Sequence, residues 1–445
     1  MKRTFFIESL GCSKNSVDSE SIKMLLIKAG FHPAHSAVRA EIILVNTCGF
    51  IDSARQESIE ILKEFAIRKR DNQVLIATGC MAQHNPDILQ EQVPQIDGLL
   101  STRRWMDIEK FIKMIDSSST SLPILHGHNE IKIGQEQNDI PRSAVQGASA
   151  YIKIADGCRR PCAFCAIPKI KGTVVSREIA AVVDEARMLE KQGVKEIILI
   201  AQDTTDYGKD LGYKNGLEKL LEALISQVPG IPWFRLMYTY PGNISDGLIN
   251  LFSTSKQLLP YLDLPLQHAH PDVLKRMRRP FNIDWTRDTI HRLRMSIPDL
   301  AIRTTFIVGF PGENEVEFQT ILEFIEELEF DHVGAFMYSH EEKTSIYTMG
   351  DTVPDDIKLE RYNQLMLTQQ EISARKNRNF VGKKLDVLIE GVDNGISIGR
   401  SYRDAPEIDG MVIVKDSCPV GEIIEVQITD SLAHDLIGKI IPIHP

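Results

Sequence analysis

The sequence has no apolar run long enough to cross a membrane, and this absence excludes a membrane-spanning helix. Its first residues, Met1–Ile7, are followed by the charged Glu8, too early for the apolar core of a signal peptide. Low-complexity stretches are also missing, and 25% of the residues are charged, which is typical of a folded globular chain rather than a disordered one. We therefore expect a soluble protein of the cytoplasm.

Cysteine is scarce and odd in number, with seven residues in a chain of 445. In a long chain without a signal peptide, this argues against a disulfide framework and for metal ligands or free thiols. Cys418 stands alone in an apolar stretch and is expected to be structural.

Basic residues are fewer than acidic ones. The chain has 51 Lys and Arg against 61 Asp and Glu, which gives a formal net charge of −10. This balance disfavours nucleic acid and favours a basic protein as partner.

Three of the cysteines, Cys158, Cys162 and Cys165, follow one another in the pattern C-x3-C-x2-C. One loop can aim these three thiolates at a common centre, yet no fourth ligand stands near them. The closest histidines, His126 and His128, fall in a segment expected to be a linker. A closed zinc site needs four ligands, whereas an iron–sulfur cubane held by three thiolates keeps one iron open. A structural zinc loop and a purely electron-carrying cluster stay open as alternatives.

The N-terminal segment alternates apolar strands with amphipathic helices, which is typical of an α/β domain with a parallel, doubly wound sheet. The expected strands are 5–7, 42–45 and 74–77, and the expected helices are 18–29, 54–70 and 88–93. Cys12, Cys48 and Cys80 each follow one of these strands, beside a glycine. Because the carboxyl ends of parallel strands share one edge, we expect these cysteines to meet there. A single buried cysteine is usually a small core residue, but three in equivalent positions predict a second cubane with an open iron.

The rest of the chain predicts two further domains. Residues 117–146 carry a serine-rich run and two prolines without periodicity, and they predict a linker. Strands expected at 151–155, 197–201, 234–238, 261–264, 303–308 and 333–338, with helices clearest at 178–192 and 315–329, predict a partial (β/α)6 barrel. A helix over 356–380 then precedes strands at 385–391, 397–400, 410–414 and 423–428, which predict a small antiparallel barrel. The expected domains are 1–116, 147–375 and 376–445, with the linker 117–146.

Polar residues and glycines follow several strands of the central barrel, at the edge where such barrels bind ligands. Gln202 and Asp203 follow the second strand, Gln267 follows the fourth and Gly309 follows the fifth. These positions suit the amino, carboxylate and ribose groups of a nucleoside cofactor. His268 and His270 are expected to be hydrogen-bonded structural side chains, and a cationic contact stays open as the alternative.

The cysteine loop and its surroundings resemble the radical S-adenosylmethionine (SAM) superfamily, and in particular its methylthiotransferase family. The resemblance includes residues 151–157 before the loop and Ala166-Ile167-Pro168, Gly172 and Ser176-Arg177 after it. It implies two [4Fe-4S] clusters, of which the one at Cys158, Cys162 and Cys165 cleaves SAM to a 5'-deoxyadenosyl radical. The other, at Cys12, Cys48 and Cys80, delivers sulfur. The expected SAM contacts are Phe164, Gln202, Asp203, Gln267 and Gly309.

Two segments resemble the branch of this family that modifies the β-carbon of an aspartate in ribosomal protein S-twelve of the small subunit. They are residues 9–20, where Ser13 replaces a frequent proline, and the Ala-Pro-Glu-Ile-Asp-Gly segment at 405–410. From Lys376 onward acidic residues outnumber basic ones, which suits docking of a basic ribosomal protein better than gripping of RNA. The expected docking residues are Arg400, Arg403, Glu407 and Asp409.

Two other functions stay open at this point. One is a transfer RNA adenosine methylthiotransferase, and the other is a non-catalytic iron–sulfur module that binds RNA. The second would need neither a SAM pocket nor a second open cluster, and the sequence predicts both. The resemblance also implies an electron donor as a further partner.

Overall fold

The computed structural model describes residues 3–117, 123–125 and 140–441. Most of the expected linker, including His126 and His128, lies outside these residues. The chain divides into two compact units, and the expected boundaries at 116, 146 and 375 stay predictions. The first unit consists of Met1–Ala144, Tyr151–Arg160 and Cys165–Glu185, and the second of Val145–Ala150, Pro161–Phe164 and Ala186–Pro445. Among the described residues, every helix is too short or too polar to span a membrane.

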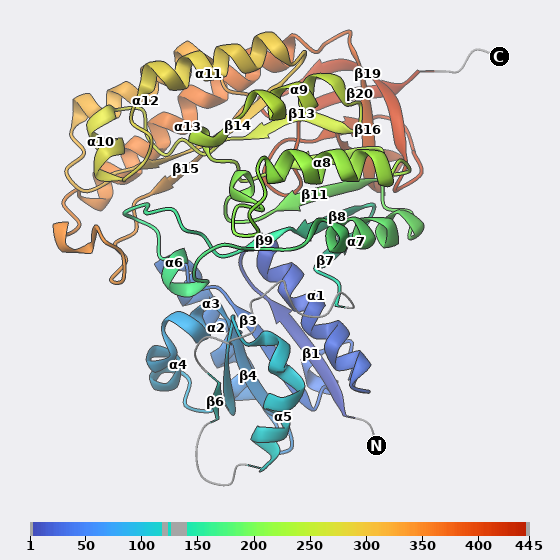
Figure 1. The fold of residues 1–445 in the computed structure, drawn as a ribbon, viewed down its shortest axis with the longest axis vertical. Coiled ribbons are helices and arrows are strands. Elements are labelled where there is room, and N and C mark those ends of the chain that lie inside the picture. Colours follow the sequence, from blue (N-terminus) through green and yellow to red (C-terminus); the bar gives the residue numbers. More distant parts are fainter. Residues whose placement is uncertain (1–2, 118–122, 126–139, 442–445) are drawn as a thin grey trace. The chain divides into compact units, whose positions relative to one another are not determined.

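A six-stranded parallel sheet forms the centre of the first unit (Figure 1). Its order is β2 (His32–Pro33), β1 (Thr4–Ser9), β3 (Ile42–Thr47), β4 (Val74–Gly79), β5 (Gly98–Ser101) and β6 (Ile124–Leu125). Its helices are α1 (Ser13–Lys28), α2 (Asp52–Arg68), α3 (Cys80–His84), α4 (Pro86–Gln92) and α5 (Ile108–Ser117). The three predicted strands and three predicted helices are confirmed. The additional strands have only two to four residues, too few to show a hydrophobic period.

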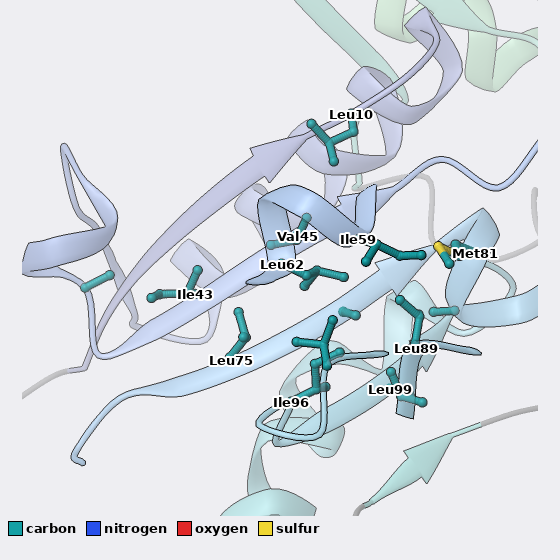
Figure 2. Packing of buried hydrophobic residues seen from close by; sticks show 14 residues of the cluster. Leu10, Ile43, Val45, Ile59, Leu62, Leu75, Met81, Leu89, Ile96 and Leu99 are labelled. Carbon is teal, nitrogen blue, oxygen red and sulfur yellow. The ribbon is translucent and has the colours of Figure 1, made fainter. Parts of the chain in front are cut away.

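The central strands bury both of their faces, as a doubly wound sheet requires. Along β3, Ile43 and Val45 pack into the core under α2 and α4, which Figure 2 shows. Ile42 and Leu44, one position out of step, pack on the opposite face against α1 and α5. Side chains of a strand alternate between faces, so a continuous apolar run fills two cores at once.

The second unit contains most of an open seven-stranded sheet. Its order is β15 (His332–Met337), β14 (Ala301–Val308), β13 (Leu258–Asp263), β12 (Trp233–Leu236), β11 (Glu196–Ile200), β8 (Ser149–Lys153) and β7 (Ser143–Gln146). The connecting helices include α7 (Ile179–Lys191), α8 (Gly216–Gln227), α9 (Asp246–Thr254), α10 (Pro271–Arg276), α11 (Ile283–Ser296) and α12 (Glu315–Leu328). The six predicted strands are β8 and β11 to β15, in chain order, which confirms the partial (β/α)6 arrangement. The pairs from β11 to β15 are parallel.

The second unit ends in the predicted long helix and small barrel. The helix is α13 (Asp355–Arg378), and the closed barrel has the order β16 (Lys384–Asp393), β17 (Ile396–Arg400), β18 (Val412–Val414), β20 (Leu436–Ile440) and β19 (Ile423–Ser431). The four predicted strands are confirmed, and β20 is a fifth that closes the barrel by pairing with β18 and β19. Cys418 is 4% exposed and packs in the barrel core, consistent with a structural role.

A buried ion network attaches this barrel to the open sheet within the second unit. The side chain of Glu196 on β11 is fully buried and accepts hydrogen bonds from Arg235 of β12 at 2.7 Å and Arg400 of β17 at 2.6 Å. Burial by itself raises the pKa of Glu196, but the two guanidinium groups outweigh it and lower the pKa to about 2. Buried charge pairs therefore hold the barrel to the sheet.

Replacing Glu196 by glutamine should lower the free energy of unfolding at neutral pH by about 3 kcal/mol, since it leaves the buried guanidinium of Arg235 without its carboxylate partner and Arg400 with Glu390 alone. The folded pKa of Glu196 lies below its unfolded value, so its contribution is complete above about pH 4.5 and is lost as the pH falls towards 2. The stability gap between wild type and Glu196→Gln should therefore narrow over that window. Thermal unfolding at pH 7 and at pH 3.5 measures this difference.

The matched control is Glu425→Gln, which removes an exposed ion pair with Lys384 at 2.9 Å in the same barrel. It should change the stability by less than about 1 kcal/mol. A gap for Glu196→Gln that does not depend on pH, or one no larger than that of the control, would contradict the assignment.

Candidate metal centre

Cys12, Cys48 and Cys80, here called the first triad, lie together at the carboxyl edge of the parallel sheet in the first unit. They follow β1, β3 and β4, the strands that the sequence predicts. Cys12 is exposed, whereas Cys48 is 9% and Cys80 is 7% exposed. A methyl group added at Gly11 would stand 2.7 Å from the Cβ of Cys48, so the turns after β1 and β3 touch. The structure thus brings together three cysteines that the sequence spreads over nearly seventy positions.

Two polar side chains hold the turns of the first triad. Asn15 on α1 is 1% exposed, and its Nδ2 donates to the carbonyl groups of Leu10 at 2.9 Å and Thr47 at 3.2 Å. Ser58 on α2 binds the backbone of Cys48 twice, accepting from its N–H and donating to its carbonyl, both at 3.0 Å. The cysteine turns are therefore shaped by hydrogen bonds that need no metal.

Burial affects the two buried thiols of the first triad. It raises the pKa of Cys48, and it raises the pKa of Cys80 to about 12, with the positive charge of Lys171 acting in the opposite direction. The metal ligand is the thiolate, so a bound metal takes the place of the protons. Within the described residues, no three His, Cys, Asp or Glu side chains are arranged to hold a single ion. Three thiols without a fourth ligand fit a cubane, which spreads its ligands around several atoms.

Cys158, Cys162 and Cys165, here called the second triad, are divided between the units. Cys158 and Cys165 belong to the first unit, where β9 (Ala155–Asp156) and β10 (Val175–Ser176) pair antiparallel on either side of the loop. The N–H of Cys158 donates to the Gly172 carbonyl at 2.9 Å, and its Sγ accepts from the N–H of Arg160 at 3.4 Å. A backbone N–H directed at a sulfur is a contact that stabilises a thiolate.

Arg279, which sequence analysis missed, contacts the middle cysteine of the second triad within the second unit. Its Nη1 donates to the Sγ of Cys162 at 3.8 Å, and its guanidinium lies 4.3 Å from the ring centre of Tyr240. The next residue, Ala163, is pinned by its N–H, which donates to the Met277 carbonyl at 2.9 Å. In the sequence Arg279 is part of a basic run after α10, and nothing local shows that the chain folds back onto the cysteine loop.

The expected SAM contacts lie at strand ends in the second unit. Gln202 and Asp203 follow β11, and Asp203 accepts a hydrogen bond from the Thr205 N–H at 3.0 Å, which caps a short helical turn. Gln267 has φ of 79° and is held by two backbone hydrogen bonds to β14. A non-glycine residue in this conformation is strained, and such strain gathers at functional sites. Phe164 packs against an apolar cluster of the same unit.

Glu313 is a second residue that sequence analysis missed. It is 5% exposed, and its carboxylate accepts from the Gly309 N–H at 2.9 Å, Arg361 at 2.7 Å and His268 at 3.2 Å. Burial lowers the pKa of His268, so the neutral ring donates to Glu313. Gly309 has φ of 72°, and a methyl group there would meet Lys358 at 2.3 Å. His268 is therefore a hydrogen-bonded structural side chain, as expected, and it braces the turn that carries Gly309.

Three of the four expected docking residues are buried within the second unit. Arg400 is 3% and Arg403 is 2% exposed, and the side chain of Asp409 is 1% exposed. Arg403 donates to Asn377 at 3.1 Å, and Asp409 accepts from the hydroxyl of a buried tyrosine on β13 at 2.6 Å. The expectation of an exposed docking surface therefore needs correction at these three positions, because their charged groups bind partners inside the protein. Only Glu407 is exposed.

Three family models match the chain. "Uncharacterized protein family UPF0004" matches residues 4–101, "Radical SAM superfamily" matches 152–325 and "TRAM domain" matches 381–441. Each match falls within one of the domains expected from the sequence.

Curated relatives match almost the whole chain. "Ribosomal protein uS12 methylthiotransferase RimO" from Herpetosiphon aurantiacus is 43% identical, and the alignment covers 98% of this chain and 100% of the relative. The proteins of the same name from Chloroflexus aurantiacus and a Thermoanaerobacter species are 45% and 42% identical, covering 98% and 97% of this chain and 99% of each relative.

Two solved structures resemble the fold. The radical SAM methyltransferase TsrM from Kitasatospora setae, with cobalamin and a [4Fe-4S] cluster bound, has a TM-score of 0.56 at 12% identity, covering 89% of this chain and 77% of its own. The cobalamin-dependent SAM radical enzyme OxsB has a TM-score of 0.53 at 9% identity, covering 83% and 56%. At such low identity the likeness concerns the fold alone.

Replacing Gly11 by alanine tests the close approach of the turns in the first triad. The new methyl group would lie 2.9 Å from the Sγ of Cys48, and overpacking of this kind costs about 1–3 kcal/mol, so the affinity for a metal cluster should fall roughly tenfold. Iron retained during a chelator challenge measures the effect. Gly382→Ala is the matched control, because its φ of +88° matches the +86° of Gly11 and nothing lies within 4 Å of the added methyl group. Equal retention by both variants would mean that the contact is unimportant.

Proposed function

This chain belongs to the RimO family of methylthiotransferases, and we propose that it attaches a methylthio group to the β-carbon of an aspartate in ribosomal protein uS12. One observation carries the proposal: relatives with this name are 41–45% identical over almost their full length. The two cysteine triads at strand ends support it, because the reaction needs both a source of radicals and a source of sulfur.

The second triad holds the [4Fe-4S] cluster that binds SAM, and the first triad holds a second [4Fe-4S] cluster. When bound, these groups supply the radical that removes hydrogen from an unactivated carbon and the sulfur that replaces it. Arg279 and the Arg160 N–H stabilise thiolates of the second triad, at Cys162 and Cys158. In the first triad Cys12 is exposed, which gives a macromolecular substrate access to that edge.

An electron donor is a necessary partner in this proposal, because reductive cleavage of SAM consumes an electron that the cysteines do not provide. Ribosomal protein as substrate is consistent with the net charge of −10 and with the exposed Glu407. We keep transfer RNA as the alternative substrate, to be decided by the binding measurement below. A cytoplasmic location, where ribosomes are, stays part of the proposal.

Replacing all three cysteines of one triad by alanine should separate the two roles. Reconstituted wild type should hold about eight irons, and each triple variant about half of them. Without the second triad, SAM cleavage should stop. Without the first triad, 5'-deoxyadenosine should still form while methylthio product on uS12 disappears. Iron analysis and mass spectrometry of both products provide the measurements.

The control for the triad variants is Cys418→Ala, which removes the seventh cysteine from the core of the small barrel and should leave the iron content unchanged. Full iron or stoichiometric zinc in the variant of the second triad would contradict the cluster assignment. Normal product formation by the variant of the first triad would mean that these strand-end cysteines are structural.

Charge reversal at Glu407 tests the choice of substrate. Glu407→Lys should weaken binding of uS12 by about 1–3 kcal/mol, as expected for a charge pair desolvated in the complex. Asp393→Lys makes the same charge change at another exposed position of the barrel and should have little effect. Removing the whole barrel is a poorer test, because Glu196 would lose its partner Arg400.

The measurement compares affinities for purified uS12 and for bulk transfer RNA at two salt concentrations. Equal losses for the two reversals would indicate long-range attraction instead of a contact at Glu407. Tight and steeply salt-dependent binding of transfer RNA, with none of uS12, would move the chain to the RNA-modifying branch.

A further inference from the structure

Four charged side chains are buried together in the first unit: Asp18 on α1, Lys153 on β8, Asp156 on β9 and Lys171 directly after α6 (Ile167–Ile170). We call them the buried quartet, and each side chain is only 2–3% exposed. The Nζ of Lys153 contacts both carboxylates, that of Asp156 at 3.1 Å. The Nζ of Lys171 also contacts both, Asp18 at 2.9 Å and Asp156 at 3.4 Å. The two lysines therefore share the same two partners.

Stability alone is a poor reason for such a cluster. Removing four charges from water is expensive, and their mutual attraction often does no better than well-packed apolar residues in the same space. The quartet is nevertheless complete, with two positive and two negative charges. The residues around the quartet indicate what its role is.

The quartet lies beside the first triad and is built largely from the chain that flanks the second. Lys153 and Asp156 precede Cys158, and Lys171 follows Cys165. Between Cys165 and Lys171, Ala166 and Ile170 form one buried cluster with Cys80. Figure 1 shows α6 next to α3, the helix that begins at Cys80.

The two lysines differ in one respect. Among the charged groups that act on the Cys80 thiol, the ammonium group of Lys171 has the largest effect, and any effect of Lys153 is smaller. Lys171 also keeps its positive charge in this buried site. Burial acts to lower its pKa, but Asp156 and Asp18 outweigh burial and raise the pKa, so the ammonium form persists.

We propose that the buried quartet is a positioning device for the first triad, in which Asp18 and Asp156 hold the ammonium group of Lys171 near Cys80 to raise the reduction potential of the cluster bound there. The inference rests on the proposed function in one respect, that the first triad holds a cluster. Reduction adds negative charge to a centre that already carries three thiolates. A fixed cation in a buried site lowers the energy of the reduced form more than that of the oxidised form.

The shared partners of the two lysines allow a matched comparison. Lys171→Met combined with Asp156→Asn leaves Lys153 paired with Asp18. Lys153→Met combined with Asp156→Asn leaves Lys171 paired with Asp18. Both double variants keep a neutral quartet with one ion pair, so they differ mainly in whether the positive charge near Cys80 is present.

The measurement uses the full chain with the second triad replaced by alanine, so that only the cluster of the first triad remains. After anaerobic reconstitution, iron is counted, and the one-electron potential is determined by redox titration followed by electron paramagnetic resonance. The Lys171 double variant should show a roughly tenfold lower ratio of reduced to oxidised cluster at a given potential, a shift of about 59 mV to more negative values. The Lys153 double variant should stay within about threefold of the parent, or about 30 mV.

Selective loss of iron from the Lys171 double variant would also support the proposal. Equal shifts in the two double variants, no shift in either, or loss of iron from both would overturn it, since each result indicates a purely structural quartet. A parent that binds no iron at its first triad would overturn the cluster assignment of the proposed function as well. A parent with a cluster and no difference between the variants leaves that assignment intact.

Discussion

Parallel pairing of strands is the constraint on which the chemistry of this protein depends. In a parallel sheet all carboxyl ends lie at one edge. Residues that follow different strands therefore become neighbours in space although they are far apart in the sequence. The first triad arises in this way from β1, β3 and β4. The candidate SAM contacts after β11, β13 and β14 occupy the equivalent edge of the second sheet. Both proposed cofactor sites are therefore built by the same rule.

Buried charge is the second theme of the structure, and it is used differently in the two units. In the second unit, Glu196 binds two arginines and ties the small barrel to the sheet. In the first unit, the buried quartet is assembled from the chain around the cysteine segments, and the charge of one of its ammonium groups acts on Cys80. In each case the opposite charges are within contact distance, which is the condition under which buried ions are tolerated. The network of Glu196 attaches the small barrel to the sheet, whereas we assign the buried quartet to the metal centre.

The small barrel shows how the same residues can be misjudged from sequence. Arg400, Arg403 and Asp409 are polar residues in a loop-rich segment, which usually indicates a surface. The structure instead buries them against the open sheet and α13, where Arg400 pairs with Glu196, Arg403 donates to Asn377 and Asp409 accepts from the Tyr261 hydroxyl. The segment remains a marker of the family branch, but its role in contacting substrate is narrowed to Glu407 and its exposed neighbours.

Local period and spacing are enough to predict the strand–helix alternation, the two sets of three cysteines and the small C-terminal barrel from the sequence. It also predicted the convergence of the first triad, because the position of a residue after a parallel strand is a local property with a global consequence. Three other sets of contacts are visible only in the folded chain. Arg279 contacts Cys162, Glu313 accepts from the Gly309 N–H, and Asp18 pairs with Lys153 and Lys171. These contacts join segments that are far apart along the chain. A local sequence pattern does not show which distant polar or charged group will pair with a buried one.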